Sequence, residues 1–395
     1  MRIAEADNQS IHDIEKQTMT TDVASPERMA NLDRPALPAL TGLRFFAALH
    51  VVTFHYGWMA LAALPEPVFQ VSRHGYVGVS LFFVLSGFVL AYNYLELGHT
   101  ERPSFWVARA ARVYPLYLLA LAVALPAHLP IAEASSTEIA ATFALEAVLL
   151  QAWTPLTACG VNCAGWSLSA EAFFYAAFPW VLLWLRTRSN RALAATAVNA
   201  WTIAVALPAA YLLVLQPYEI LHRDQPLMYV ALIYAPLLHL PQFAIGAAAG
   251  IVYARRRSGG LGSPLPPWSG PAAAAASLAV LAWIDLPYPL VNNGLLSPLF
   301  AVLILGLADG RGWLARFLAT RPMQHLGEAS YAVYILQIPL AGWFSWATTG
   351  SWLPRFETPG TFLTFVALLV SISLASFTWI ETPCRRRIRS FFAHR

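Results

Sequence analysis

An imidazole and a guanidinium group lie within one long apolar segment of this 395-residue chain, where lipid should exclude both. The segment, residues 40–64, is long enough to cross a bilayer and carries Arg44 and His55. Since eleven residues rotate a helix to within about 20° of its starting direction, the two side chains share one face, roughly 16 Å apart along the axis. Ionisable residues at such depth usually mark function, and an imidazole there can act as a general base.

A structural role for both residues is the alternative. Arg44 could extend its side chain to the nearer headgroups, and His55 could be an interior histidine whose hydrogen bonds are satisfied. His50 lies in the same segment but points away from the face that Arg44 and His55 share. The polar residues of the other apolar segments bear on the choice.

A carboxylate lies in a second apolar segment, residues 164–185. Glu171 is expected about two turns into the membrane from the outer side, with Ser167 one turn earlier on the same face. A carboxylate at this depth is costly unless it is paired or functional. His55 lies about 22 Å along a helix that is expected to begin on the inside, which is the level of Glu171. The spacing therefore predicts a His55–Glu171 pair in the outer third of the membrane.

Two guanidinium groups open a third segment, residues 105–127. Arg109 and Arg112 are three residues apart, on one face and beside the expected helix N-terminus. Paired guanidinium groups next to a positive helix end are typical of a phosphate site, whereas the alternative is that these arginines only fix the topology. Arg44 is expected at the same inner level. A phosphate-bearing cofactor could therefore bind at the inner end, with its reactive tip near the predicted histidine–carboxylate pair.

The composition excludes an ordinary soluble domain. Hydrophobic residues make up 58% of the chain and charged residues 12%, with a mean hydropathy of +0.54. Soluble domains carry about twice that share of charge, so we expect an all-α polytopic membrane protein surrounded by the lipid bilayer. The net charge of +4 does not imply a nucleic-acid partner, and no metal-ligand spacing appears. Neither nucleic acid nor a metal ion is therefore expected.

Eleven apolar runs are candidates for membrane-spanning helices. They lie near residues 40–64, 76–95, 105–127, 138–154, 164–185, 193–215, 237–254, 271–287, 293–309, 329–347 and 361–380. The run 138–154 is short and contains Glu138 and Glu146, and if it does not cross, nearly all arginine clusters fall on one side. Because basic residues select the cytoplasmic side, we expect about ten spanning helices, both termini in the cytoplasm, and a place in the inner (plasma) membrane.

The chain divides into three expected regions. Residues 1–36 are polar, mixed in charge and lack the apolar core of a secretory signal, so we expect a disordered cytoplasmic tail. Residues 37–384 are expected to form the transmembrane domain and residues 385–395 a basic cytoplasmic tail. Cys159 and Cys163 lie close together in an expected outer loop, where a local disulfide could form.

An ordered set of short motifs extends over residues 40–383. The set comprises Arg44 with His55, Phe82-Phe-Val-Leu-Ser-Gly-Phe88, Arg109 and Arg112 before Tyr114-Pro115, Trp166-Ser-Leu-Ser-Ala-Glu171, Leu240-Pro-Gln-Phe243, Leu326-Gly-Glu-Ala-Ser-Tyr-Ala-Val-Tyr334 and Glu381-Thr-Pro383. Each motif alone is common. Together and in this order they resemble acyltransferase family 3, which includes membrane-bound O-antigen, exopolysaccharide and peptidoglycan O-acetyltransferases and macrolide acyltransferases.

The resemblance implies an acyl-CoA donor bound from the cytoplasm, most commonly acetyl-CoA. It implies transfer of the acyl group to a hydroxyl of a glycan or lipid-linked saccharide at the outer side. By this resemblance His55 is the catalytic base and Glu171 its functional partner. The same resemblance assigns Arg44, Arg109 and Arg112 to donor binding or to structure.

One position departs from the family pattern. Many members have a histidine after Tyr-x-x-Tyr-x-Leu, where this chain has Gln337. An amide can hydrogen-bond but cannot relay a proton at neutral pH, so a proton-transfer role is not expected at this position.

Two other classes of function are alternatives. In a transporter or a receptor-like relative the buried charges would line a permeation path, although no pair of broken helices occurs in matching halves of the sequence. A structural helper in a glycan-export complex would leave His55 and Glu171 without a task. The arginine pair and the resemblance favour the membrane O-acyltransferase.

Overall fold

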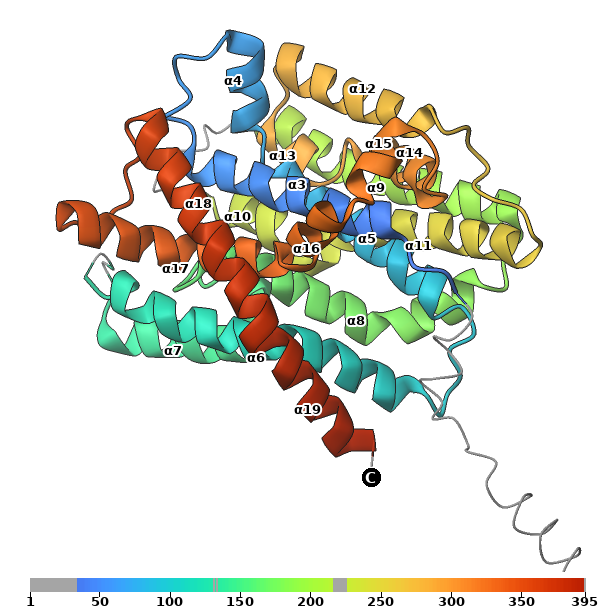
Figure 1. Ribbon diagram of the computed structural model, residues 1–395, viewed down its shortest axis with the longest axis horizontal. Coiled ribbons are helices and arrows are strands. Elements are labelled where there is room, and N and C mark those ends of the chain that lie inside the picture. The colour runs from blue at the N-terminus through green and yellow to red at the C-terminus, as the bar shows by residue number, and fades with distance from the viewer. Residues whose placement is uncertain (1–33, 131, 133, 216–225, 394–395) are drawn as a thin grey trace, which may run out of the picture. The chain divides into compact units, whose positions relative to one another are not determined.

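The computed structural model of the protein describes residues 34–130, 132, 134–215 and 226–393, so residues 1–33 of the predicted N-terminal tail lie outside the described residues. Ala36–Arg395 forms one compact unit. This unit is built from helices, and no strand occurs in the part of the chain that the structure describes (Figure 1). The predicted all-α class is therefore confirmed for these residues.

Each of the eleven predicted apolar runs contains a helix. The principal helices are α3 (Pro38–Tyr56), α4 (Glu66–Arg73), α5 (Val77–Asn93), α6 (Arg102–His128), α7 (Ser136–Ala147), α8 (Trp166–Leu185), α9 (Asn190–Leu215), α10 (Leu227–Tyr234), α11 (Pro236–Ser258), α12 (Ser269–Trp283), α13 (Tyr288–Asn292), α14 (Ser297–Ala308), α15 (Trp313–Leu318), α16 (Arg321–Glu328), α17 (Ser330–Thr349), α18 (Pro359–Ser376) and α19 (Thr382–Ala393). Two short 3-10 helices, Gln151–Trp153 and Cys163–Gly165, precede α8.

Six described helical segments are long and apolar enough to cross a bilayer, or seven when α4 and α5, which are bent by 56°, form one span. Three segments of the predicted ten remain: α3 with 19 residues, α12 with 15 and α17 with 20. At about 1.5 Å per residue, α3 and α17 approach the thickness of the hydrocarbon core and α12 falls short of it. The count of about ten therefore stays a prediction.

The first apolar helix is shorter than expected. α3 ends at Tyr56, and the backbone N–H of Gly57 caps it by donating to the carbonyl oxygen of Thr53. Residues 57–64, expected to continue the helix, form turns before Pro65. His55 therefore lies in the last turn of α3.

The segment after α6 turns back into the bundle. α7 has 12 residues, about 18 Å, which is too short to cross and agrees with the prediction for this run. A disulfide joins Cys159 to Cys163 in the connection to α8. This connection is held inside, since the side chain of Asn162 is buried and donates to the carbonyl oxygen of Ile335 at 3.1 Å.

α5 and α11 form the closest helix pair at the centre of the unit (Figure 1). A Cβ atom added at Gly87 would overlap the carbonyl oxygen of Phe243, and one added at Gly246 would overlap that of Val84. Small residues permit this approach, because any larger side chain would force the two backbones apart. The contact holds α5 in the position from which its side chains line the cavities described below.

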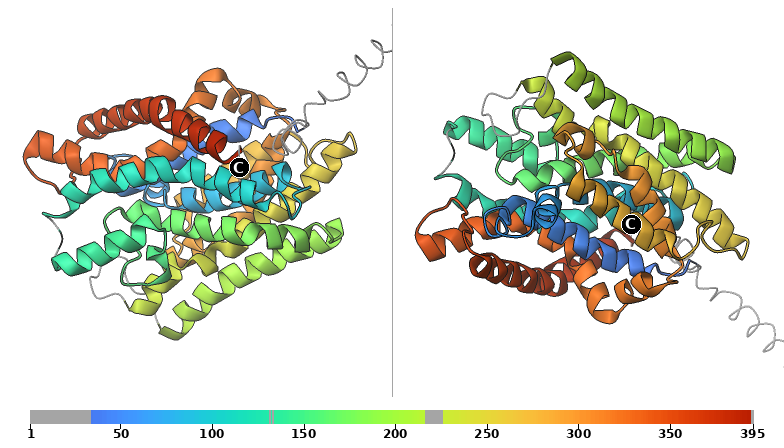
Figure 2. Two further views of the ribbon diagram at one scale, coloured as in Figure 1. Left: turned by 90° about the horizontal axis from the view of Figure 1, so that it is seen from below. Right: turned by 90° about the horizontal axis from the view of Figure 1, so that it is seen from above.

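α9 lies at the edge of the bundle opposite α18, as both views of Figure 2 show. Large apolar side chains along it are exposed, including Val198, Ile203, Leu207 and Leu213. A contiguous exposed apolar face on a long helix is typical of contact with lipid.

The last long helical segment, α18 with α19, crosses over α6, and a short stretch of another helix type interrupts it (Figure 1). A π-helix, Phe377–Glu381, separates α18 from α19. The basic segment predicted as a tail is therefore helical up to Ala393, and it packs along α6.

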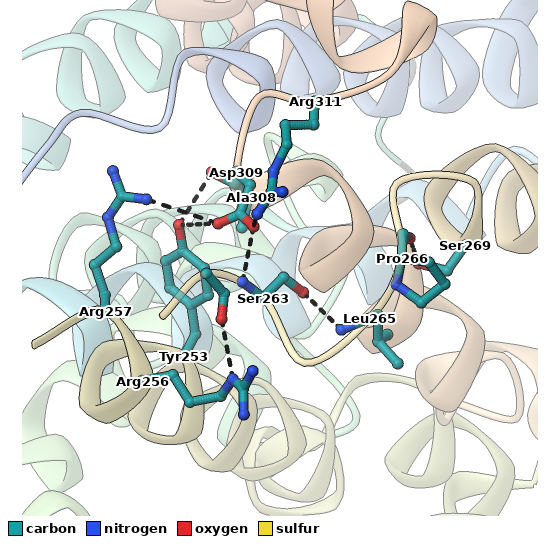
Figure 3. Close-up of polar contacts among 11 residues, drawn as sticks. Tyr253, Arg256, Arg257, Ser263, Leu265, Pro266, Ser269, Ala308, Asp309 and Arg311 are labelled. Atoms are coloured by element: carbon teal, nitrogen blue, oxygen red, sulfur yellow. Dashed lines mark hydrogen bonds and ion pairs between the residues drawn. The ribbon is translucent and has the colours of Figure 1, made fainter. Parts of the chain in front are cut away.

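A carboxylate joins the end of α14 to the connection between α11 and α12 (Figure 3). Asp309 accepts hydrogen bonds from the backbone N–H of Ser263 at 2.8 Å, from Arg311 at 2.9 Å and from the hydroxyl of Tyr253 at 3.0 Å. Its side chain is 7% exposed. Burial by itself would raise the pKa of Asp309, but these donors outweigh burial and lower the pKa below its usual value.

Replacing this carboxylate, Asp309→Asn, is expected to lower the free energy of unfolding by about 1.5–3 kcal/mol at pH 7, the range for charge-assisted hydrogen bonds. Because the folded-state pKa lies below the unfolded value of about 3.9, the stabilisation is complete above that pH and is lost as the pH falls through the folded-state pKa. Thermal unfolding of the detergent-solubilised protein at pH 7 and at pH 3 measures both effects.

The matched control for this prediction is Glu66→Gln, which neutralises an exposed carboxylate on α4. It should leave the unfolding midpoint unchanged at either pH. A midpoint for Asp309→Asn equal to that of the unsubstituted protein at pH 7 would show that the cluster does not stabilise the fold.

Candidate functional site

A cavity of about 150 Å³ brings together the arginines that the sequence singled out. Arg44 of α3 lines it with Arg109 and Arg112 of α6, and Glu171 of α8 lies in the same wall. The remaining lining is mainly aromatic and apolar. We refer to this space as the arginine cavity.

The guanidinium groups of the arginine cavity are held in different ways. Arg109 donates to the hydroxyl of Tyr94 at 3.1 Å and lies over the Phe105 ring, 5.8 Å from its centroid. Arg44 interacts electrostatically with Arg112 and with two carboxylates, Glu171 and Glu381. The site therefore holds more arginines than carboxylates, and this excess of positive charge suits an anionic ligand.

The expected contribution of a helix N-terminus to this site is wrong. α6 begins at Arg102, seven residues and therefore about 10 Å before Arg109. The positive end of the helix dipole acts only within about the first turn. The side chains themselves supply the positive charge here.

Glu171 is held by neighbours in the arginine cavity. Its Oε1 accepts a hydrogen bond from Ser86 Oγ at 3.1 Å and a second one from the hydroxyl of Tyr175. The predicted pairing with His55 is not formed. The reason is the packing of the helices: α8 turns Glu171 toward Ser86 of α5, whereas α3 turns His55 toward Gln337 of α17.

His55 lines a second cavity, of about 270 Å³, which we call the histidine cavity. Its walls are rich in aromatic side chains, chiefly Tyr76, Trp166, Tyr229, Tyr234 and Tyr288. Two residues, Val79 and Tyr334, line both cavities. The arginine cavity and the histidine cavity are therefore neighbours that share part of a wall.

Gln337 determines which nitrogen of His55 carries the proton. The amide NH₂ of Gln337 donates to the carbonyl oxygen of Tyr334 at 2.8 Å, so that its Oε1 faces Nδ1 of His55 at 3.0 Å. An amide oxygen only accepts, and Nδ1 must therefore be the N–H. Nε2 keeps its lone pair and has no hydrogen-bond partner among the described residues, as a general base requires.

His50 is a structural histidine on the same helix. Its Nε2 bonds the carbonyl oxygen of Val71 at 2.7 Å, and it lines neither cavity. The expectation that His50 points away from the face of Arg44 and His55 is confirmed.

Sequence reasoning gave no individual role to Ser86, Tyr175 and Glu381, which lie near the cavities. It noted Gln337 only as a departure from the family pattern and did not predict its hydrogen bond to His55. Two signals were present: Tyr175 stands four residues after Glu171, on the same helical face, and Glu381 is a lone acid between the last apolar run and a run of arginines. Across the described ranges no group of three or more His, Cys, Asp or Glu side chains could hold a metal ion.

A family profile described as an acyltransferase domain matches residues 37–379. Acyltransferase MdmB from Streptomyces mycarofaciens is 26% identical over 375 residues, covering 89% of this chain and 92% of the relative. The putative peptidoglycan O-acetyltransferase YrhL of Bacillus subtilis is 25% identical over 398 residues, with 91% of this chain and 57% of the relative covered.

A third relative is the peptidoglycan O-acetyltransferase OatA of Listeria monocytogenes, which is 22% identical over 399 residues. The match covers 91% of this chain and 57% of the relative. The chain thus spans 57% of the length of YrhL and of OatA. No solved structure matches the chain.

Proposed function

Because the chain belongs to this acyltransferase family, we propose that it moves an acyl group from acyl-CoA in the arginine cavity to an acceptor hydroxyl in the histidine cavity. The observation that carries the proposal is the shared wall: an anion-binding space and a space with a histidine base are neighbours. A thioester held by its nucleotide in the first can present its carbonyl to the second.

The donor end is proposed to bind phosphate. Arg44, Arg109 and Arg112 offer guanidinium groups, which bind phosphate oxygens in a bidentate manner. Under the proposed topology of about ten crossings with cytoplasmic termini, this end faces the cytoplasm, where acyl-CoA is made. Acetyl-CoA is the donor that the family resemblance favours.

The proposed reaction transfers an acyl group from the thioester sulfur of the donor to the hydroxyl oxygen of the acceptor. His55 Nε2 takes the proton of the acceptor hydroxyl as its oxygen attacks the thioester carbonyl carbon. The new C–O bond forms, the C–S bond breaks, and the CoA thiolate leaves. The proton on His55 then passes to the thiolate or to water, which restores the base. Gln337 stabilises the charged ring through Nδ1–H throughout.

Glu171 is proposed to act on the donor side. It interacts electrostatically with Arg44 and accepts a hydrogen bond from the hydroxyl of Tyr175. Arg44 and Tyr175 both line the arginine cavity. A carboxylate there fixes the orientation of its neighbours and limits the repulsion among the arginines. In this assignment Glu171 shapes the donor site, and Gln337 takes the role of orienting the imidazole.

The acceptor is proposed to be a saccharide or lipid-linked glycan. Relatives named as peptidoglycan O-acetyltransferases belong to the same family, and the histidine cavity offers tyrosine hydroxyls and aromatic faces that suit a sugar ring. The inner (plasma) membrane is the proposed location. A transporter is not favoured, since the relatives are named acyltransferases.

Sealed membrane vesicles test the function and its sidedness together. Everted vesicles expose the cytoplasmic face, so radiolabelled acetyl-CoA added outside is expected to label envelope glycan held inside. Right-side-out vesicles given the same donor should remain unlabelled. Equal labelling of both would overturn the sidedness, and no labelling of either, with glycan present, would overturn the acyl-CoA reaction.

A further inference from the structure

α19 presents two of its arginines to the bundle and two to the outside. Arg385 and Arg389 are four residues apart, on one helical face, and partly buried, whereas Arg386 and Arg387 are exposed. α19 packs along α6, the helix that carries Arg109 and Arg112. The inward pair therefore approaches the arginines already assigned to the donor.

Arg385 lies within electrostatic range of the same cluster, on a helix that packs against α6. Arg385 interacts with Arg112, Arg109 and Arg389, and with only one carboxylate, that of Glu381. The cluster thus contains five arginines, counting Arg44, but only two carboxylates among these interacting residues, those of Glu171 and Glu381. Repulsion among guanidinium groups is relieved when a polyanion binds between them.

Buried donors at this junction have no partner. The Nε of Arg109, the Nε of Arg389 and the Oγ1 of Thr382 are buried without a hydrogen bond in the structure, beside one orphaned acceptor, Oε1 of Glu381. More than about 90% of buried polar groups in proteins are hydrogen-bonded, so a group of orphaned donors on facing helices indicates a ligand that accepts hydrogen bonds. This observation is independent of the charge count.

We infer that α19 completes a polyphosphate site, in which Arg385 and Arg389 bind the phosphates of the donor nucleotide together with the arginines of α6. The inference rests on the proposed function for the identity of the ligand, since CoA carries a pyrophosphate and a 3′-phosphate. The π-helix Phe377–Glu381 contributes by altering the helical phase before α19, which turns Glu381 inward and sets the face that Arg385 occupies.

Direct binding tests the site without turnover. Titration of CoA into the purified full chain in zwitterionic lipid nanodiscs should show Arg385→Ala weakening the dissociation constant about 10–100-fold, as expected for a lost charge-assisted contact. Arg385→Lys should weaken CoA binding less than Arg385→Ala, because lysine keeps the positive charge but cannot form the bidentate contact of a guanidinium group. The matched control, Arg386→Ala on the outer face, should bind within about twofold of the unsubstituted protein.

Acetyl-pantetheine, which lacks the nucleotide, should bind the unsubstituted protein and Arg385→Ala equally. Equal CoA binding by Arg385→Ala and Arg386→Ala overturns the inference and leaves the proposed function standing. Failure of the unsubstituted protein to bind CoA at all overturns the proposed function itself. The same phosphate chemistry could come from a lipid headgroup: stabilisation by anionic nanodiscs that disappears in Arg385→Ala, with CoA binding unchanged, also overturns the inference.

Discussion

Replacing His55 by alanine is expected to reduce acyl transfer by about 10²–10⁴-fold, the usual contribution of a general base. The structure separates this effect from donor binding, because His55 lines the histidine cavity while the arginines line its neighbour. CoA affinity and the unfolding midpoint should therefore change little. Initial rates of label transfer at matched expression, together with CoA titration, measure both quantities.

Two glutamine variants distinguish a base from a packing residue. His55→Gln keeps a hydrogen-bonding side chain of similar reach but cannot take a proton, so it should be as inactive as the alanine variant. His50→Gln, on the same helix and outside both cavities, should retain transfer. Substantial activity in His55→Gln would remove His55 from the mechanism.

Gln337→Leu is expected to slow transfer by roughly 10²-fold, since the proton on Nδ1 of His55 would lose its acceptor and Nε2 would no longer be held as the free base. Gln337→His introduces the residue of the family pattern at this position. It should keep most of the rate, because a ring nitrogen can accept a hydrogen bond from Nδ1–H. The double variant His55→Ala with Gln337→Leu should be no slower than His55→Ala alone.

The pH–rate profile separates positioning from structural support. Gln337→Glu places a carboxylate against Nδ1, which stabilises the protonated ring and should move the acid limb of the profile to higher pH. Gln242→Leu is the matched control: it removes another buried glutamine that bonds a histidine, at 3.0 Å, and should lower the unfolding midpoint without moving the profile. An unshifted profile for Gln337→Glu, with rates near those of the unsubstituted protein, would contradict the assigned role.

Much of the helical architecture follows from the sequence alone. Apolar runs of about 20 residues favour helices in lipid, because a helix satisfies its backbone polar groups within one segment, and each predicted run contains a helix. Helical periodicity also separates the face of Arg44 and His55 from that of His50, as the structure confirms. The arginine pair of α6 needed only its spacing to be recognised, and it lies with Arg44 in one cavity.

The partner of His55 was the first property that only the tertiary structure decided. Residue counts predicted one level for His55 and Glu171, but α8 turns Glu171 toward Ser86 of α5, whereas His55 faces Gln337 of α17. Glu171 therefore lies beside the arginines, and the predicted His55–Glu171 pair does not form. No local pattern in the sequence shows which neighbouring helix each of these side chains will face.

Contacts between distant segments were the second such property. Gln337 bonds His55 across 282 positions of sequence, and Arg385 comes within electrostatic range of Arg109 and Arg112 only because the last helix packs against α6. Periodicity places a side chain on a face of its own helix but does not select the neighbour that the face will meet. Residue types and spacing thus determined the kind of chemistry available to this protein, whereas the packing of helices decided which of those residues act together.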